Sequence, residues 1–106
     1  MRDELQAGLA PALRARDALR VSVLRTTLAA VANAEAVDAS GAGPVSGVYA
    51  GDVPRRELSD DDVRAVVVAA RDELRTAEAE LRAVGQIEAA SDLAVQVGVL
   101  DGYLAP

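Results

Sequence analysis

The feature of this sequence that most constrains its fold is a run of apolar residues spaced alternately four and three positions apart. The run consists of Val63, Val67, Ala70, Leu74, Ala77, Leu81 and Val84. Because an α-helix has about 3.6 residues per turn, this spacing places all of these side chains along one side of a helix. Gly85 follows directly, and glycine is typical of the position just after a helix end. The segment is therefore predicted to be an amphipathic helix that buries one face.

A second apolar run begins just after this glycine and has a similar spacing. Its members are Ile87, Ala90, Leu93, Val97, Leu100 and Leu104. Two amphipathic helices joined by a short turn can bury their apolar sides only against each other and against a third element. The sequence therefore predicts an antiparallel helical hairpin within an all-α domain.

Two further helices are predicted before the hairpin. In the helix over residues 2–15, Pro11 is expected to cause a kink or to mark the true start, because proline lacks the N–H that a helix interior uses. The helix over residues 18–37 follows Asp17, a residue type that caps helix N-termini, and it is apolar on two sides. This second helix is therefore expected at the centre of a four-helix open array.

Residues 38–57 separate these helices from the hairpin and are rich in glycine and proline. They are interpreted as a long mobile loop, with a short extended piece over residues 45–49 as the alternative. The hairpin then begins at Ser59, an N-cap residue, with Asp62 in the place of the capping-box partner. The acidic run 60–62 favours a helix N-terminus over a metal site, because consecutive helical residues point in different directions.

Composition excludes most kinds of catalysis. The chain has 106 residues, which suits a single domain over 1–106, and it contains no histidine, cysteine or lysine. Thiol nucleophiles, the usual zinc ligands and a histidine partner for any serine are therefore absent. We expect no intrinsic enzyme activity, no cofactor and no metal. The lack of cysteine and of a long apolar run fits a cytoplasmic protein without a membrane segment.

The net charge of −6 is unevenly distributed along the chain. Residues 1–37 carry five arginines and four carboxylates, whereas residues 38–106 carry six arginines and thirteen carboxylates. A chain this acidic is repelled by nucleic acid unless its arginines are clustered.

The arginines do cluster in two places, along the first hairpin helix and around the start of the helix over 18–37. The candidate RNA- or partner-binding residues are Arg16, Arg20, Arg25, Arg64, Arg71, Arg75 and Arg82. If both clusters lie on one face, they could hold RNA or another polyanion, because arginine forms bidentate contacts with phosphate. In the alternative interpretation, the hairpin arginines are solvated side chains that pair with neighbours such as Asp72 and Glu78.

Four segments, taken in order, resemble the signatures of one protein family, the YqeY proteins. Residues 16–25, RDALRVSVLR, resemble the family's KDxxRxSVLR, and residues 33–35, NAE, resemble the end of the same helix. Residues 57–63, ELSDDDV, are similar to ELSDEEV. The pieces at 85–93 and 99–104 resemble GRxDL followed by ILExYLP. The resemblance covers nearly all of the chain except the glycine-rich loop.

This resemblance implies a GatB/YqeY-like helical module, shared with the C-terminal tail of GatB, a subunit of tRNA-dependent amidotransferase. That enzyme is a carbon–nitrogen ligase with glutamine as amido donor, and it converts Glu-tRNA or Asp-tRNA to the amide form. The tail helps to hold tRNA and does not perform the chemistry. The implied function is a non-catalytic accessory module that associates with tRNA or with an amidotransferase or synthetase complex.

The chain departs from the family pattern in two respects. Family members continue past the YLP ending into a further subdomain, the part most like the GatB tail, and this subdomain is expected to be missing here. The family's basic KQRR patch corresponds to residues 72–75, DELR, in which only Arg75 matches. The alternative function is a helical protein–protein interaction module, without an RNA role, that pairs through the exposed side of the hairpin.

Overall fold

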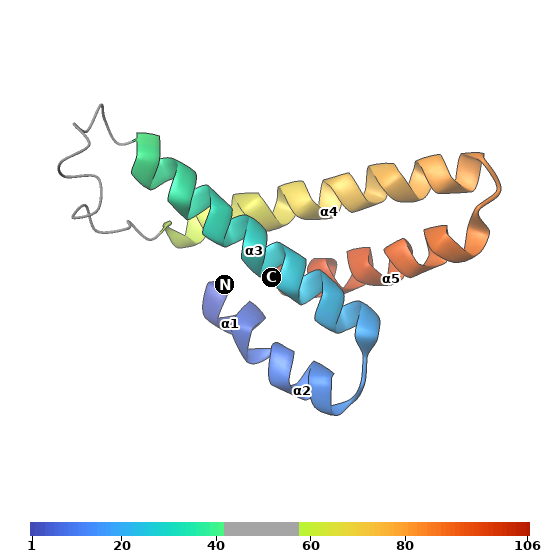
Figure 1. Ribbon diagram of the computed structural model, residues 1–106, viewed down its shortest axis with the longest axis horizontal. Helices are drawn as coiled ribbons and strands as arrows, with labels where there is room; N and C mark the ends of the chain where they lie inside the picture. The colour runs from blue at the N-terminus through green and yellow to red at the C-terminus, as the bar shows by residue number, and fades with distance from the viewer. Residues whose placement is uncertain (42–57) are drawn as a thin grey trace.

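The computed structural model describes residues 1–41 and 58–106, and it describes the side chains of 1–36 and 58–106 (Figure 1). Within these residues the chain is all-α, as the sequence predicts. The elements in chain order are α1 (Arg2–Ala7), α2 (Leu9–Arg14), α3 (Ala18–Gly41), α4 (Asp60–Ala83) and α5 (Ile87–Leu104).

Helix α3 is longer than the sequence suggested. It continues through residues 38–41, which were predicted to open the loop, and it ends at Gly41. No glycine or proline precedes Gly41 in this stretch, so nothing in the backbone stops the helix earlier. The remainder of the predicted loop, with its alternative extended piece at 45–49, lies outside the described residues.

The single helix expected over residues 2–15 is two short helices, α1 and α2, which meet at Gly8. Pro11 lies in the first turn of α2 and lacks the N–H that would bond to the carbonyl of Ala7, the last residue of α1. The interruption expected from Pro11 therefore lies one turn before it. A side chain at position 8 would collide with the hydroxyl group of Tyr103 from α5. Glycine at this position therefore allows the Tyr103 side chain to lie against the junction of α1 and α2.

Capping groups fix the ends of the longer helices. The Ser59 Oγ accepts a hydrogen bond from the N–H of Asp62 at 3.1 Å, and the carboxylate of Asp17 accepts one from the N–H of Arg20 at 3.1 Å. Both predicted caps are confirmed. At the end of α4, Gly85 adopts a φ of 81°, a conformation that side chains disfavour and that reverses the chain into α5.

Helices α4 and α5 lie side by side as an antiparallel hairpin. Helix α3 crosses the base of this hairpin, which is the end where α4 starts and α5 finishes (Figure 1). Helices α1 and α2 pack along α3, and Arg2 of α1 pairs with Glu35 in the second half of α3. Helix α3 contacts each of the other helices, which confirms its predicted central place. None of the described helices combines the length and the hydropathy that a membrane crossing requires.

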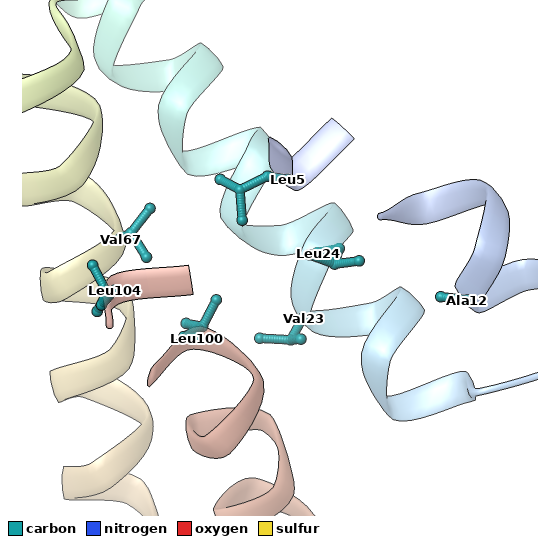
Figure 2. Close-up of a cluster of buried hydrophobic side chains, with 7 residues drawn as sticks. All are labelled: Leu5, Ala12, Val23, Leu24, Val67, Leu100 and Leu104. Atoms are coloured by element: carbon teal, nitrogen blue, oxygen red, sulfur yellow. The ribbon is translucent and has the colours of Figure 1, made fainter. Parts of the chain in front are cut away.

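The core sits at this crossing and takes buried side chains from every helix (Figure 2). Its members are Leu5, Ala12, Val23, Leu24, Val67, Leu100 and Leu104. Leu28 and Leu74 are half-buried against this cluster, as the apolar spacing predicted. Because these side chains are small, the helices must approach closely to bury a useful apolar area.

Burial decreases along α4 with distance from α3. Val63 and Val67 are fully buried, Leu74 and Leu81 are half-buried, and Val84 is 72 % exposed. The prediction that the apolar run from Val63 to Val84 is buried along its whole length is therefore wrong near Val84, because α3 covers only the base of the hairpin.

Replacing Leu100 with alanine should be far more costly than replacing Leu81. We expect Leu100→Ala to lower the free energy of unfolding by about 2–5 kcal/mol, through lost burial and a residual cavity. Leu81→Ala should lower it by less than about 2 kcal/mol, because Leu81 is already partly hydrated. Urea unfolding of both variants measures the difference, and equal losses would contradict the gradient of burial along α4.

Candidate functional site

The candidate arginines of α4 all donate hydrogen bonds within the chain. At the start of the helix, Arg64 donates from Nη2 to the carbonyl oxygen of Leu104, the last residue of α5. Carbonyl groups at a helix C-terminus lack helical donors, and a cation there also complements the helix dipole. Arg64 therefore ties the start of α4 to the end of α5.

Arg71 and Arg75 share the carboxylate of Asp101 on α5. Arg71 Nη1 lies 3.2 Å from Asp101 Oδ1, and Arg75 Nη2 lies 3.3 Å from Asp101 Oδ2. Arg71 also lies 3.2 Å from the carboxylate of Asp72. Desolvation lowers the pKa of Arg71, but hydrogen bonds and charges from Asp72 and Asp101 outweigh it and raise this pKa above its ordinary value. These carboxylates stabilise the charged form of the guanidinium group.

Arg82, the last of the α4 arginines, pairs along its own helix. Its Nε lies 3.0 Å from the carboxylate of Glu78, one helical turn earlier. Pairing of the hairpin arginines with Asp72 and Glu78 was the alternative interpretation of this cluster, and the structure confirms it. The same carboxylates that hold these guanidinium groups also reduce their attraction for an external polyanion.

Arg20 lies on a different side of the hairpin from Arg71 and Arg75. Its guanidinium carbon is 5.8 Å from the centre of the Tyr103 ring, within the range of a cation–π contact. Asp101 and Tyr103 project about 200° apart around α5, because they are two residues apart on a helix. The two arginine clusters therefore do not join on one basic face.

Arg16 and Arg25 differ from the other candidate residues. Both are exposed, and neither side chain has a hydrogen bond or an ion pair with any described residue. They border an open groove of about 620 Å³ between the end of α2 and the first half of α3. We call it the α2–α3 groove, and its lining residues are Leu13, Arg16, Ala18, Val21, Ser22, Arg25 and Thr26.

The backbone of Arg16 has an unusual conformation. Its φ is 55°, and Arg16 is the one non-glycine residue with positive φ in the described part of the chain. The N–H groups of Arg16 and Asp17 donate to the carbonyl oxygens of Leu13 and Ala12, at 3.1 and 3.0 Å. This pattern ends α2 with a left-handed residue, the position that Gly85 occupies after α4. The predicted end at residue 15 agrees with α2, which ends at Arg14 with Ala15 as its C-cap. The left-handed conformation of Arg16 was not predicted, because arginine is not the residue that usually adopts it.

The turn between α4 and α5 carries exposed apolar side chains. Val84 is 72 % exposed and Ile87 is 53 % exposed, on either side of Gly85. The exposed carboxylates of Glu80 and Glu88 lie within one helical turn of them in the sequence. We call residues 81–88 the hairpin end. The sequence analysis placed Val84 and Ile87 in the two apolar runs that were expected to be buried. This exposed apolar surface is therefore visible only in the structure.

The buried carboxylate of this structure is paired. Glu35 is only 8 % exposed, and its Oε2 lies 2.6 Å from Nη2 of Arg2. This carboxylate is therefore already engaged in an ion pair within the chain. In the part of the chain that the structure describes, no group of three or more acidic residues is placed to hold a metal ion.

Comparison with known proteins adds no relative to this description. No protein-family model, no curated protein and no solved structure matches the chain. The resemblance to YqeY proteins therefore stays a prediction that rests on the sequence motifs.

Replacing Arg16 with glycine should stabilise the protein. A left-handed conformation disfavours a residue with a Cβ by about 1 kcal/mol relative to glycine. Arg16→Gly should therefore raise the melting temperature by roughly 4–8 °C, as expected for a domain of this size. Arg14→Gly is the matched control, because it removes the same charge inside α2 and should lower stability. A lower melting temperature for Arg16→Gly would show that the arginine side chain itself stabilises the helix end.

Proposed function

We propose that this chain is a non-catalytic helical binding module that docks onto a protein partner through the hairpin end. The observation that carries this proposal is the exposure of Val84 and Ile87, which continue the same apolar stripes that form the core at the base of the hairpin. Exposed apolar side chains gathered at one end of a rigid element are characteristic of a docking surface.

The charge around the hairpin end indicates the chemistry of the partner. The exposed carboxylates of Glu80 and Glu88 flank the apolar residues. Because Arg82 is already paired with Glu78, these carboxylates would repel the corresponding carboxylates of a second copy and would also repel phosphate groups. The partner that fits is a protein with an apolar pocket bordered by basic side chains.

The resemblance to YqeY proteins gives this proposal a biological setting. On that basis, the partner belongs to a tRNA-dependent amidotransferase or to a synthetase complex in the cytoplasm, and this chain is an accessory to its carbon–nitrogen ligase chemistry. The described arginines of α4 support a protein contact more than a tRNA contact, because Arg71, Arg75 and Arg82 are all paired with carboxylates.

Site-specific crosslinking tests the proposed docking surface. Because the chain contains no cysteine, Val84→Cys can carry a photo-crosslinking label at a single position. We expect this label to capture one protein species in the native cytosol, whereas a label on Ala29→Cys, at an exposed position of α3, should not. The captured protein, once purified, should bind the unlabelled chain and should bind Ile87→Asp at least roughly tenfold more weakly.

Ile87→Asp is a suitable variant because it should leave the fold intact. Residue 87 is the first residue of α5, where a negative charge is favourable to the helix dipole. An unchanged melting temperature verifies this. Equal capture by both labels, or equal affinity of Ile87→Asp for the purified partner, would contradict docking through the hairpin end.

Association with tRNA is the second candidate function. The observation in its favour is that Arg16 and Arg25 have no partner among the described residues, and both belong to the segment most similar to the YqeY proteins. Against it stand the net charge of −6 and the separation of the two arginine clusters.

A filter-binding titration with bulk tRNA decides between the two candidates. We expect no saturable binding at physiological salt, for the wild-type chain or for Asp101→Asn, in which Arg71 and Arg75 lose a shared carboxylate. If tRNA is instead a ligand, binding should saturate, and Arg25→Gln should reduce the slope of log affinity against log salt by about one. That result would replace the first candidate with the second.

A further inference from the structure

The α2–α3 groove combines an apolar floor with cationic edges. Leu13, Ala18 and Val21 supply apolar surface, and Leu13 is half exposed, at 50 %. Arg16 and Arg25 stand at the groove without a partner among the described residues. This distinguishes them from the α4 arginines, each of which already donates a hydrogen bond within the chain.

No described carboxylate forms an ion pair with Arg16 or Arg25. Asp17 is the nearest acidic residue in the sequence, and its carboxylate accepts a hydrogen bond from the N–H of Arg20. The hydroxyl of Thr26 is also engaged, since it donates to the carbonyl oxygens of Ser22 and Val23, at 3.0 and 3.2 Å. The polar groups left to bind a ligand are therefore mainly the two guanidinium groups.

The position of Arg16 adds a second observation. Its side chain projects from a helix end that glycine would satisfy at lower energy. An arginine at this place works against local backbone preference, and such conflicts between a residue and its backbone tend to occur where the side chain has a function.

The shape of the groove favours an elongated ligand. Its α3 side extends from Ala18 to Thr26, which corresponds to about 12 Å at a helical rise of roughly 1.5 Å per residue. It is an open trough along about two helical turns, and its opposite wall is the end of α2. An amphipathic helix lies in such a trough through residues spaced three and four positions apart.

We infer that the α2–α3 groove binds an acidic amphipathic helix of a partner protein. Apolar side chains of that helix lie on Leu13 and Val21, and its carboxylates pair with Arg16 and Arg25. Charge complementarity indicates an acidic occupant, because the guanidinium groups of Arg16 and Arg25 have no ion pair with a described residue. This basic and apolar surface lies on a molecule whose net charge is −6. RNA fits less well, since phosphate groups make no use of the apolar floor. The inference rests on the proposal that the chain is a protein-binding module, but it assigns a second surface to that function.

Selection from a displayed peptide library tests this inference without knowledge of the partner. The library should encode helices of about 15 residues, or four turns, with random residues on one face. We expect the enriched peptides to carry Asp or Glu beside apolar residues at helical spacing. An enriched peptide, labelled with a fluorophore, should bind roughly three- to tenfold more weakly to Arg25→Gln and to Arg16→Gly. Its affinity should also fall as salt concentration rises.

Matched variants separate this site from the rest of the molecule. Arg82→Gln removes an equal charge at the hairpin end and should leave peptide affinity unchanged. Leu13→Ser should weaken binding while the fold is kept, because this leucine is half exposed. Ile87→Asp should bind the peptide normally, so failure of docking at the hairpin end and failure of this groove are distinguishable.

Several outcomes would overturn the inference. One is the enrichment of no peptide, or of peptides without acidic residues. Another is a peptide affinity that is indifferent to both Arg16→Gly and Arg25→Gln. Bulk tRNA that competes for the groove more strongly than the selected peptide would make RNA the occupant instead. Self-association that Arg25→Gln abolishes would assign the groove to a second copy of this chain.

Discussion

The packing of α3 across the base of the α4–α5 hairpin is the interaction on which the rest of the described structure depends. Leu24 of α3 joins one buried cluster with Val67 of α4 and Leu100 of α5 (Figure 2). Helices α1 and α2 add Leu5 and Ala12 to the same cluster. Only the base of the hairpin is covered by a third element, and beyond that point α4 and α5 support each other alone. The exposed hairpin end is a consequence of this single crossing.

The crossing also determines which charges are available to a partner. Asp101 faces Arg71 and Arg75 across the hairpin, and Arg20 lies over Tyr103 on another side of α5. Among the arginines that the structure describes, four are held by carboxylates, namely Arg2, Arg71, Arg75 and Arg82. The apolar residues of the hairpin end are flanked by the carboxylates of Glu80 and Glu88, whereas those of the groove are flanked by Arg16 and Arg25. Two surfaces of opposite charge would suit a protein that links two partners, and such a role requires no catalytic group.

Much of the fold was accessible from the sequence, and the exceptions have identifiable causes. Apolar spacing predicted both hairpin helices, and Ser59, Asp17 and Gly85 indicated where helices begin and end. The close approach of Tyr103 to Gly8 was missed because the two residues are distant in the sequence. The left-handed conformation of Arg16 after α2 was missed because arginine is not the residue that this conformation favours. The apolar stripes of the hairpin gave no sign that their far ends would be left exposed.

The sequence by itself determined the secondary structure, because helix periodicity, caps and turns depend on interactions within about four residues along the chain. It also suggested the ion pair of Arg82 with Glu78, for the same reason. Only the tertiary structure decided that Arg64 binds the end of α5 and that Arg71 and Arg75 share Asp101. These contacts join positions 26 to 40 residues apart. They depend on the register between two packed helices, which follows from how their small apolar side chains interlock and not from any local pattern of residues.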